Sequence, residues 1–302
     1  MLQIPQPGNS IITKNSLLYN IFFQPSLISS KMINKLFIKI LSRIAPTFVV
    51  NKLYNTLNNP RSRMPSNYRT NVFSFANKEV VEFKGINIQT YHWDGKGPEV
   101  MLIHGWEGSA VNFEKIINFL VDNDFKVRTF DAPSHGLSED SKSTMYDFRE
   151  LVYHMIKKYS IKNLITHSFG AVPSTYLAAN KKVFMEKMVL IACPNNFYDW
   201  IIDVSSKFGI GKKIVDLTID KIEKKYDMDI NDMSVAEFAK DLKKVKSLII
   251  HGDIDKIIPI EKPLEVYKNW EGSKFLKLKN LGHSKILRSD EAINSLLNFL
   301  KE

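Results

Sequence analysis

The stretch NLITHSFGA (residues 163–171) decides the fold, because it joins a short β-rich run to a glycine-containing turn at Ser168. Ser168 lies where a predicted strand over 163–167 meets a predicted helix over 169–180. A sharp turn at such a junction lifts a serine hydroxyl above the end of a sheet, and Gly170 lets the strand and helix backbones approach each other. A surface turn in which Ser168 only caps the helix is the alternative interpretation of this pattern.

On either side of this stretch, short β-rich runs alternate with amphipathic segments of helical length. An antiparallel pair over 80–85 and 86–93 precedes predicted strands over 99–105, 126–131, 163–167, 187–192, 247–252 and 274–279. Predicted helices cover 110–122, 145–159, 169–180, 261–269 and 290–301. Most strands are unbroken apolar runs, as expected when helices cover both faces of a parallel sheet. The sequence therefore predicts an α/β fold with a twisted, mostly parallel sheet flanked by helices.

Two predicted helices carry a capping signal at their first residue. Thr144 is followed three residues later by Asp147, and Ser234 is followed by Glu237. In such a capping box, the hydroxyl and the carboxylate accept hydrogen bonds from backbone N–H groups that the helix leaves unpaired. We expect both helices to begin at these residues.

The alternation of strands and helices is interrupted once. About fifty residues, from about 194 to 245, contain helical patterns and no convincing strand. An insertion at this place lies above the carboxyl ends of the strands, where open α/β sheets bind their ligands. We therefore expect residues 194–245 to form a helical lid over the site.

The excess of positive over negative charge lies at the beginning of the chain. The formal net charge is +10, and residues 1–78 contain ten Lys and Arg side chains but no Asp or Glu. Residues 79–302 are therefore formally neutral, which argues against a nucleic acid as the partner. We divide the chain into a basic N-terminal extension (1–78, with a helix at about 31–57) and an α/β domain (79–302).

The helix predicted in the extension carries a basic stripe. Lys31, Lys35, Lys39 and Arg43 recur at every fourth position, while apolar side chains cover the rest of its surface. Because like charges at this spacing repel one another, packing against another surface has to stabilise the helix. We expect it to dock against the α/β domain near the lid, with peripheral contact to an anionic membrane as the alternative.

Several features of the sequence bear on its location. The charged residues of the extension interrupt its most hydrophobic window, so no run of about 20 apolar residues could span a bilayer. The single cysteine, Cys193, allows no intramolecular disulfide, and the first residues lack the basic start of a signal peptide. We expect a cytoplasmic protein, with membrane association left open.

Three further motifs follow predicted strands. HGW (104–106) ends the first parallel strand, HGDID (251–255) contains two acids, and LGHS (281–284) follows the last strand. Because parallel strands end at the same edge of a sheet, these motifs are expected to lie near Ser168. The chain order of serine, acid and histidine is that of a hydrolase triad.

Together these motifs resemble the α/β-hydrolase superfamily, and in particular a branch of mostly uncharacterised bacterial α/β-fold hydrolases with a serine nucleophile. The resemblance covers nearly all of residues 80–302 and also includes FDAPSHGLS (130–138), in which Ser134 replaces a glycine of the family pattern. Thr166 likewise stands where the family has glycine. The resemblance implies a hydrolase that cleaves carboxylic esters or thioesters through an acyl-enzyme.

Residue by residue, the resemblance makes Ser168 the nucleophile and His283 the general base. The carboxylate that orients His283 is Asp253 or Asp255, and the family spacing G-x-x-D-x-x-x-P over 252–259 favours Asp255. Such an acid fixes the imidazole tautomer and stabilises the imidazolium ion. His135 is the strongest alternative base.

The remaining implications concern the oxyanion hole and the partners. The backbone N–H groups of Trp106 and Phe169 are expected to stabilise a developing oxyanion. No metal motif or phosphate-binding loop is present in the sequence, so we expect no cofactor or metal and a small acyl-ester or thioester substrate. A non-catalytic relative that binds a small hydrophobic ligand or a membrane remains the alternative, and the oligomeric state stays open.

Overall fold

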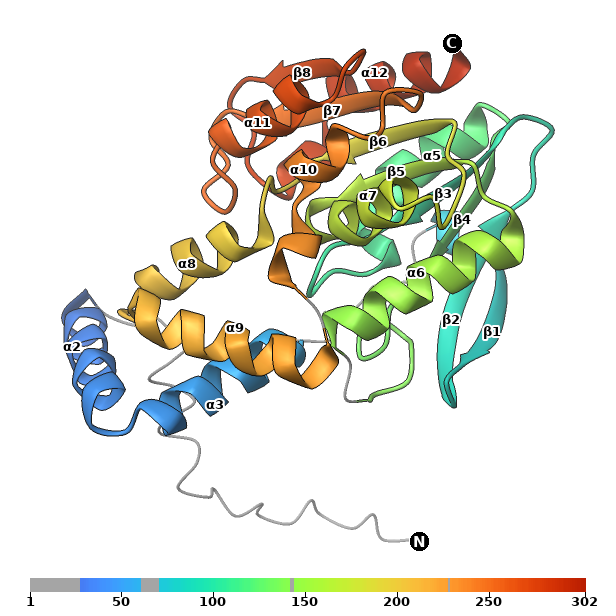
Figure 1. The fold of residues 1–302 in the computed structure, drawn as a ribbon. Helices are drawn as coiled ribbons and strands as arrows, with labels where there is room; N and C mark the ends of the chain where they lie inside the picture. The colour runs from blue at the N-terminus through green and yellow to red at the C-terminus, as the bar shows by residue number, and fades with distance from the viewer. Residues whose placement is uncertain (1–27, 61–70, 142–143, 228) are drawn as a thin grey trace, which may run out of the picture.

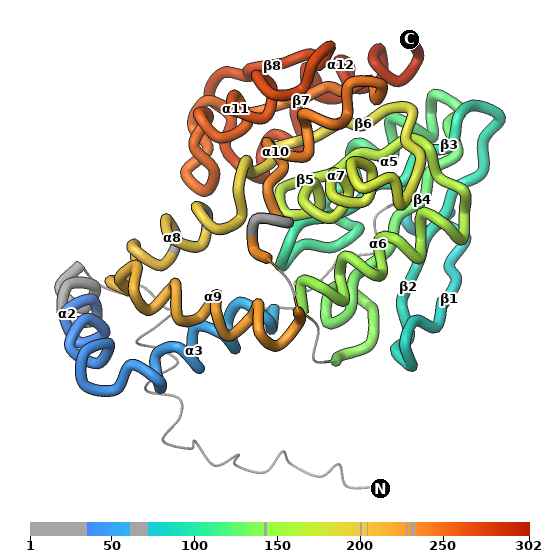
Figure 2. The backbone as a smooth tube through the Cα atoms, viewed as in Figure 1, coloured from blue at the N-terminus to red at the C-terminus, as the bar shows by residue number. Residues whose placement is uncertain are grey.

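The computed structural model describes residues 28–60, 71–141, 144–227 and 229–302. Figure 1 shows a twisted sheet with helices on both faces, and a separate group of helices beyond one end of the sheet. The backbone trace in Figure 2 gives the same arrangement, with the first helix farthest from the sheet. Within the described ranges, no helix has the length and apolar character needed to cross a membrane.

The sheet has eight strands in the order β1-β2-β4-β3-β5-β6-β7-β8. The pairs β1–β2 and β2–β4 are antiparallel, and all other neighbours are parallel, which confirms the predicted fold class. The observed strands are β1 (Asn77–Phe83), β2 (Ile86–Trp93), β3 (Glu99–Ile103), β4 (Lys126–Phe130), β5 (Asn163–His167), β6 (Lys187–Ile191), β7 (Lys246–Gly252) and β8 (Lys274–Leu278).

Two hydrophobic clusters, one on each face of the sheet, explain the unbroken apolar runs. In β3, Met101 and Ile103 belong to one cluster, while Val100 and Leu102 belong to the other, and all four are buried. Alternate side chains of a strand point to opposite faces, so a strand covered on both faces needs apolar residues throughout.

Different helices supply the two clusters. The helices that pack on the sheet in the first cluster are α6 (Met145–Tyr159), α7 (Ala171–Ala179), α10 (Val235–Ala239) and α11 (Glu261–Asn269), and helices beyond the end of the sheet also contribute to it. Those of the second are α5 (Glu114–Asp122), which follows the 3-10 turn η1 (Ala110–Phe113), and α12 (Asp290–Lys301), which follows η4 (Lys285–Arg288).

The two predicted capping boxes have different outcomes. At the start of α6, the N–H of Asp147 donates to Oγ1 of Thr144 (3.2 Å) and the N–H of Thr144 donates to the Asp147 carboxylate (3.0 Å), which confirms the box. At α10, Oγ of Ser234 accepts from the N–H of Glu237 (3.3 Å), but the Glu237 carboxylate binds Lys240 instead. The second box is therefore only half formed.

The insertion predicted at about 194–245 is helical in the described residues. It contains α8 (Phe197–Lys207), α9 (Lys212–Tyr226), η3 (Ile230–Met233) and α10. Figure 1 shows α8 and α9 extending beyond the sheet, whereas α10 returns to lie near α7. Only the first part of the insertion therefore extends away from the sheet.

The N-terminal extension forms two helices, α2 (Ile28–Ile44) and α3 (Pro46–Asn58), rather than one helix over 31–57. Pro46 causes the break, because it lacks an N–H group and its ring would crowd the preceding turn of a continuous helix. Pro46 instead occupies the start of α3, where no N–H partner is needed. A short helix, α4 (Asn71–Ser74), precedes β1.

The two helices of the extension pack differently. The buried side chains of α3 belong to the same hydrophobic cluster as those of α9, and Tyr54 contacts Tyr226 through their hydroxyls (3.2 Å). On α2, Ile38 is buried but several other large apolar side chains are exposed. The extension is therefore not a separate appendage, because α3 docks against α9.

Candidate active site

Ser168 lies at the turn between β5 and α7 in a strained backbone conformation. Its φ angle is +52°, in the left-handed region that residues other than glycine rarely occupy. Two glycines leave room for the turn. A Cβ atom on Gly105 would lie 2.9 Å from Cβ of Ser168, and one on Gly170 would lie 2.5 Å from the backbone oxygen of Ile103. The segment over 103–105 thus lies directly against the Ser168 turn.

Thr166, which replaces a glycine of the family pattern, and Pro173 are both accommodated locally near Ser168. Thr166 is fully buried, and its hydroxyl donates to the backbone oxygen of Val189 on the neighbouring strand (3.3 Å). Pro173 lies in the first turn of α7, where the backbone nitrogen needs no partner within the helix. Neither residue changes the strand-turn-helix geometry.

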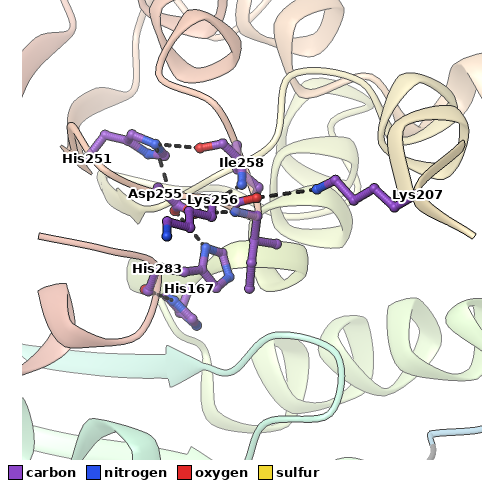
Figure 3. Close-up of polar contacts among 8 residues, drawn as sticks. His167, Lys207, His251, Asp255, Lys256, Ile258 and His283 are labelled. Carbon is purple, nitrogen blue, oxygen red and sulfur yellow. Dashed lines mark hydrogen bonds and ion pairs between the residues drawn. The ribbon is translucent and has the colours of Figure 1, made fainter. Parts of the chain in front are cut away.

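His283 is paired with Asp255. The Nδ1–H group of His283 donates to Oδ2 of Asp255 (2.7 Å), while the backbone N–H groups of residues 257 and 258 donate to Oδ1 (2.8 and 3.0 Å; Figure 3). Asp253 accepts instead from the backbone N–H of Asn280 (2.7 Å). Of the two acids that the sequence left open, the structure brings Asp255 to His283.

The surroundings of Asp255 favour its ionised form. Burial opposes ionisation, but the hydrogen bond and charge of His283, together with the two backbone N–H groups, outweigh it and hold the pKa of Asp255 below its usual value. The carboxylate therefore keeps a proton on Nδ1 of His283. This tautomer leaves Nε2 with its lone pair available to accept a proton.

Two further histidines brace this pair. His167 Nε2–H donates to the backbone oxygen of His283 (3.0 Å), and His251 Nε2–H donates to the backbone oxygen of Ile258 (2.9 Å). Burial lowers the pKa of His167 to about 3 and also lowers the pKa of His251. Both are neutral at physiological pH and hold the loops that carry His283 and Asp255 (Figure 3).

His135 is not placed to act as a base. Its Nδ1–H donates to the backbone oxygen of Pro133 (2.8 Å), and its Nε2 accepts from the backbone N–H of Glu107 (3.0 Å). Burial, followed by the nearby charge of His104, lowers the pKa of His135 to about 3. Both ring nitrogens are thus occupied, Nδ1 within its own loop and Nε2 in fixing the backbone that follows Trp106.

Both ring nitrogens of His104 are likewise hydrogen-bonded to backbone groups. Its Nδ1–H donates to the backbone oxygen of Gly105 (2.7 Å), and its Nε2 accepts from the backbone N–H of Ala132 (3.0 Å). Burial lowers the pKa of His104 to about 4. The ring joins the loop after β3, which carries Trp106, to the loop after β4.

Ser134, which replaces a family glycine, takes the left-handed conformation that a glycine would provide. Its φ angle is +61°, and its hydroxyl donates to the backbone oxygen of Ser141 (2.5 Å) while accepting from the Ser141 N–H (2.9 Å). These bonds offset the strain of the turn. Nearby, the fully buried Asp131 accepts from the N–H groups of Ala110 (2.8 Å) and Leu137 (3.0 Å).

A cavity of about 600 Å³ brings the candidate residues together. Ser168, His283, Trp106 and Phe169 all line it, and Asp255 lies behind His283. The Trp106 and Phe169 rings meet edge to face with centroids 6.0 Å apart. The other lining side chains are mostly apolar and include Phe197, Ile201, Phe208, Ile210, Leu53 and Leu57.

The sequence did not predict that α3 contributes to this cavity. Leu53, Thr56 and Leu57 line it together with α8 and the turn after α8. The periodic apolar residues of 49–57 indicate a buried helix face, but they carry no signal for the surface that buries them. The helix that we placed in a basic extension therefore forms part of the site.

Neither the cysteine nor a metal ligand set competes with these residues in the described part of the chain. Cys193 is fully buried, and burial raises the pKa of its thiol to about 12, so the reactive thiolate is not formed. Among the described residues, no group of three or more His, Cys, Asp or Glu side chains could hold a metal ion.

The fold and the position of this site define the class of the protein. Residues 98–209 match the family model described as the alpha/beta hydrolase fold, and the sheet order and the turn at Ser168 agree with it. The protein therefore has the α/β-hydrolase fold, as the motifs predicted.

Particular relatives are similar at low identity. The chain is 24% identical over 242 residues to the uncharacterised hydrolase YugF of Bacillus subtilis, a match that covers 66% of this chain and 88% of YugF. It is also 24% identical to a pimeloyl-[acyl-carrier protein] methyl ester esterase of Vibrio atlanticus, over 35% of this chain and 41% of that enzyme. Among solved structures, the thioesterase domain from the curacin biosynthetic pathway superposes with a TM-score of 0.54 at 16% identity, covering 75% of this chain and 99% of that domain.

Proposed function

We propose that this protein is a serine hydrolase that cleaves carboxylic ester or thioester bonds through an acyl-enzyme on Ser168. The observation that carries the proposal is the 2.7 Å hydrogen bond between His283 and Asp255, with His283 and Ser168 lining one apolar cavity. Because Nδ1 of His283 carries the shared proton, Nε2 is the basic nitrogen that faces the reaction. The names of two relatives, an esterase and a thioesterase, support the same class of substrate.

The proposed reaction has two halves. In the first, Nε2 of His283 takes the hydroxyl proton of Ser168 while Oγ attacks the acyl carbon. The resulting oxyanion accepts hydrogen bonds from the backbone N–H groups of Trp106 and Phe169, and each such donor lowers the barrier by about 3–4 kcal/mol. The imidazolium then protonates the departing alcohol or thiol.

In the second half, His283 takes a proton from water, and the resulting hydroxide attacks the acyl-enzyme. Collapse of the second oxyanion returns the proton to Oγ of Ser168 and releases the carboxylic acid. Asp255 keeps its charge throughout and stabilises the imidazolium. The aromatic and aliphatic lining of the cavity suits an acyl chain better than a polar substrate.

Labelling with a fluorophosphonate probe tests the nucleophile. We expect the wild type to be labelled at Ser168, Ser168→Ala to remain unlabelled, and His283→Ala to be labelled far more slowly. Peptide mass spectrometry identifies the modified residue, and circular dichroism checks that each variant is folded. A folded wild type that neither reacts nor hydrolyses simple thioesters would refute the proposal and favour a non-catalytic protein that binds a hydrophobic ligand.

A further inference from the structure

The described part of α2 presents apolar side chains to solvent on the side opposite to its buried contact. Ile38 is 1% exposed, whereas Leu36 and Ile40 are 60% and 48% exposed and Ile44 is 75% exposed. Leu36, Ile40 and Ile44 follow one another at intervals of four residues, so they form a single stripe along the helix. Together with the exposed Phe37, we call this stripe the α2 apolar face.

A basic stripe runs beside the α2 apolar face. Lys35, Lys39 and Arg43 are exposed, and each immediately precedes a member of the apolar stripe. A step of one residue is about 100° around a helix, so the two stripes are adjacent. Among the described residues none of these three side chains forms an ion pair, and residues 1–78 contain no acid in their sequence. The cations are thus available to an external anion.

This combination fits one kind of surface. A helix that lies in a membrane interface buries an apolar stripe among the acyl chains and places Lys and Arg beside it, at the level of anionic headgroups. A second copy of this chain would bring the same cations together at a two-fold interface, which is unfavourable. A protein partner would need an apolar groove with acidic edges, whereas a bilayer adapts to a convex helix.

The location of α2 relates this face to the cavity. A Cβ atom on Gly209 would lie 2.9 Å from the backbone oxygen of Lys35, so α2 lies against the turn between α8 and α9. Phe208 and Ile210, on either side of Gly209, line the cavity, as does α3. Figure 1 shows α2 as the outermost helix, at the end of the molecule away from the sheet.

We propose that the α2 apolar face and its basic stripe dock on the surface of an anionic phospholipid bilayer. When α2 lies on the bilayer with this face down, α3 and the α8–α9 turn, which line the cavity, are held next to the lipid. The interaction itself does not depend on catalysis. Only its consequence, the delivery of acyl substrates from the bilayer, rests on the proposed function.

Vesicle flotation with the full chain tests docking directly. The wild type is expected to float with vesicles of phosphatidylcholine mixed with phosphatidylserine, and to bind vesicles of phosphatidylcholine alone much more weakly. The triple variant Lys35→Glu/Lys39→Glu/Arg43→Glu is expected to bind anionic vesicles at least about 100-fold more weakly, from the loss of three favourable charges near the surface. Ile40→Asp/Ile44→Asp keeps the three cations but replaces two apolar contacts by negative charges, and it is expected to lose at least about 10-fold.

A matched control carries the same kinds of substitution elsewhere on the molecule. Lys181, Lys182 and the 69% exposed Phe184 follow α7, which runs away from the Ser168 end of the sheet. The variant Lys181→Glu/Lys182→Glu/Phe184→Asp should therefore float like the wild type. Ser168→Ala should also float like the wild type, which separates docking from the proposed reaction.

Three outcomes would overturn the proposal. The first is a wild type that fails to float with anionic vesicles. The second is a control variant that loses as much binding as the two α2 variants. The third is a wild type that does not bind vesicles but forms a dimer in analytical ultracentrifugation, with Ile40→Asp/Ile44→Asp converting the dimer to a monomer. That result would assign the α2 apolar face to a second copy of the chain.

Discussion

Nε2 of His167 lies 3.0 Å from the backbone oxygen of His283, so the residue before Ser168 holds the loop of the histidine that pairs with Asp255. The two rings also lie side by side, with centroids 4.8 Å apart. This contact links the turn after β5 to the loop after β8, which are far apart in the sequence. In the proposed reaction His167 is a positioning residue, because it acts through His283.

Removing the side-chain donor of His167 should therefore weaken catalysis without weakening substrate binding. For His167→Leu we expect kcat to fall about 10- to 100-fold with KM nearly unchanged, because small misplacement of a catalytic group has a large kinetic cost. His167→Gln keeps an N–H donor at a similar reach and should restore most of kcat. Steady-state kinetics on a simple ester measures both effects, and equal values of kcat for the Leu and Gln variants would contradict the positioning role.

The two acids of the HGDID segment should differ sharply in their effect on activity. Asp255→Asn removes the charge beside Nδ1 of His283 and disfavours its reactive tautomer, so kcat should fall about 10⁴-fold. Asp253→Asn should retain nearly full activity, because an amide oxygen can still accept from the Asn280 N–H group. The two substitutions lie two residues apart in the chain, and each removes one negative charge, so each variant is a control for the other. Comparable losses in kcat would disprove our choice of Asp255.

The buried histidines His104 and His135 should make the protein sensitive to mild acid. Their pKa values are lowered to about 4 and about 3, mainly by burial, whereas the usual value in an unfolded chain is about 6.5. Below pH 6.5 the unfolded state binds protons that the folded state does not, so the free energy of unfolding falls as the pH falls towards 4. At pH 5 each residue should contribute a loss of about 2 kcal/mol.

Urea unfolding at pH 7 and pH 5 measures this loss. His135→Gln should be less stable than the wild type at pH 7, but its further loss between pH 7 and pH 5 should be smaller by about 2 kcal/mol. Carboxylates titrate mainly below this interval, so they contribute little to the difference. A wild type equally stable at both pH values would contradict the neutral, doubly hydrogen-bonded state of these rings.

The sequence predicted the sheet well because local features determine it. The apolar runs, the Thr144 capping signal and the turn at Ser168 each depend on residues close together in the chain, and the structure places strands and α6 where these signals lie. The pairing of His283 with Asp255 was favoured only by the resemblance, because the family spacing from Gly252 to Pro259 fits Asp255.

Features that depend on distant partners were not predicted. Nothing near Leu53 or Leu57 indicates that α9 and the cavity bury them. The break at Pro46, which separates α3 from the more exposed α2, has a local cause instead, although we expected one helix over 31–57. The histidine tautomers were equally beyond the sequence. His104 and His135 are each fixed by backbone groups from another loop, and only the folded structure brings those loops together.

The contribution of α3 to the cavity predicts that this helix limits the acyl chain. Thr56 lines the cavity and is only half buried, so Thr56→Phe adds bulk to the cavity with a small risk of unfolding. We expect kcat/KM for long-chain thioesters to fall about 10-fold or more, a loss of about 1–3 kcal/mol from one obstructed contact, while acetyl esters are unaffected. Asn55→Phe is the matched control, because the neighbouring Asn55 is exposed. If both variants changed the ratio of long-chain to acetyl turnover equally, α3 would not set the length of the chain.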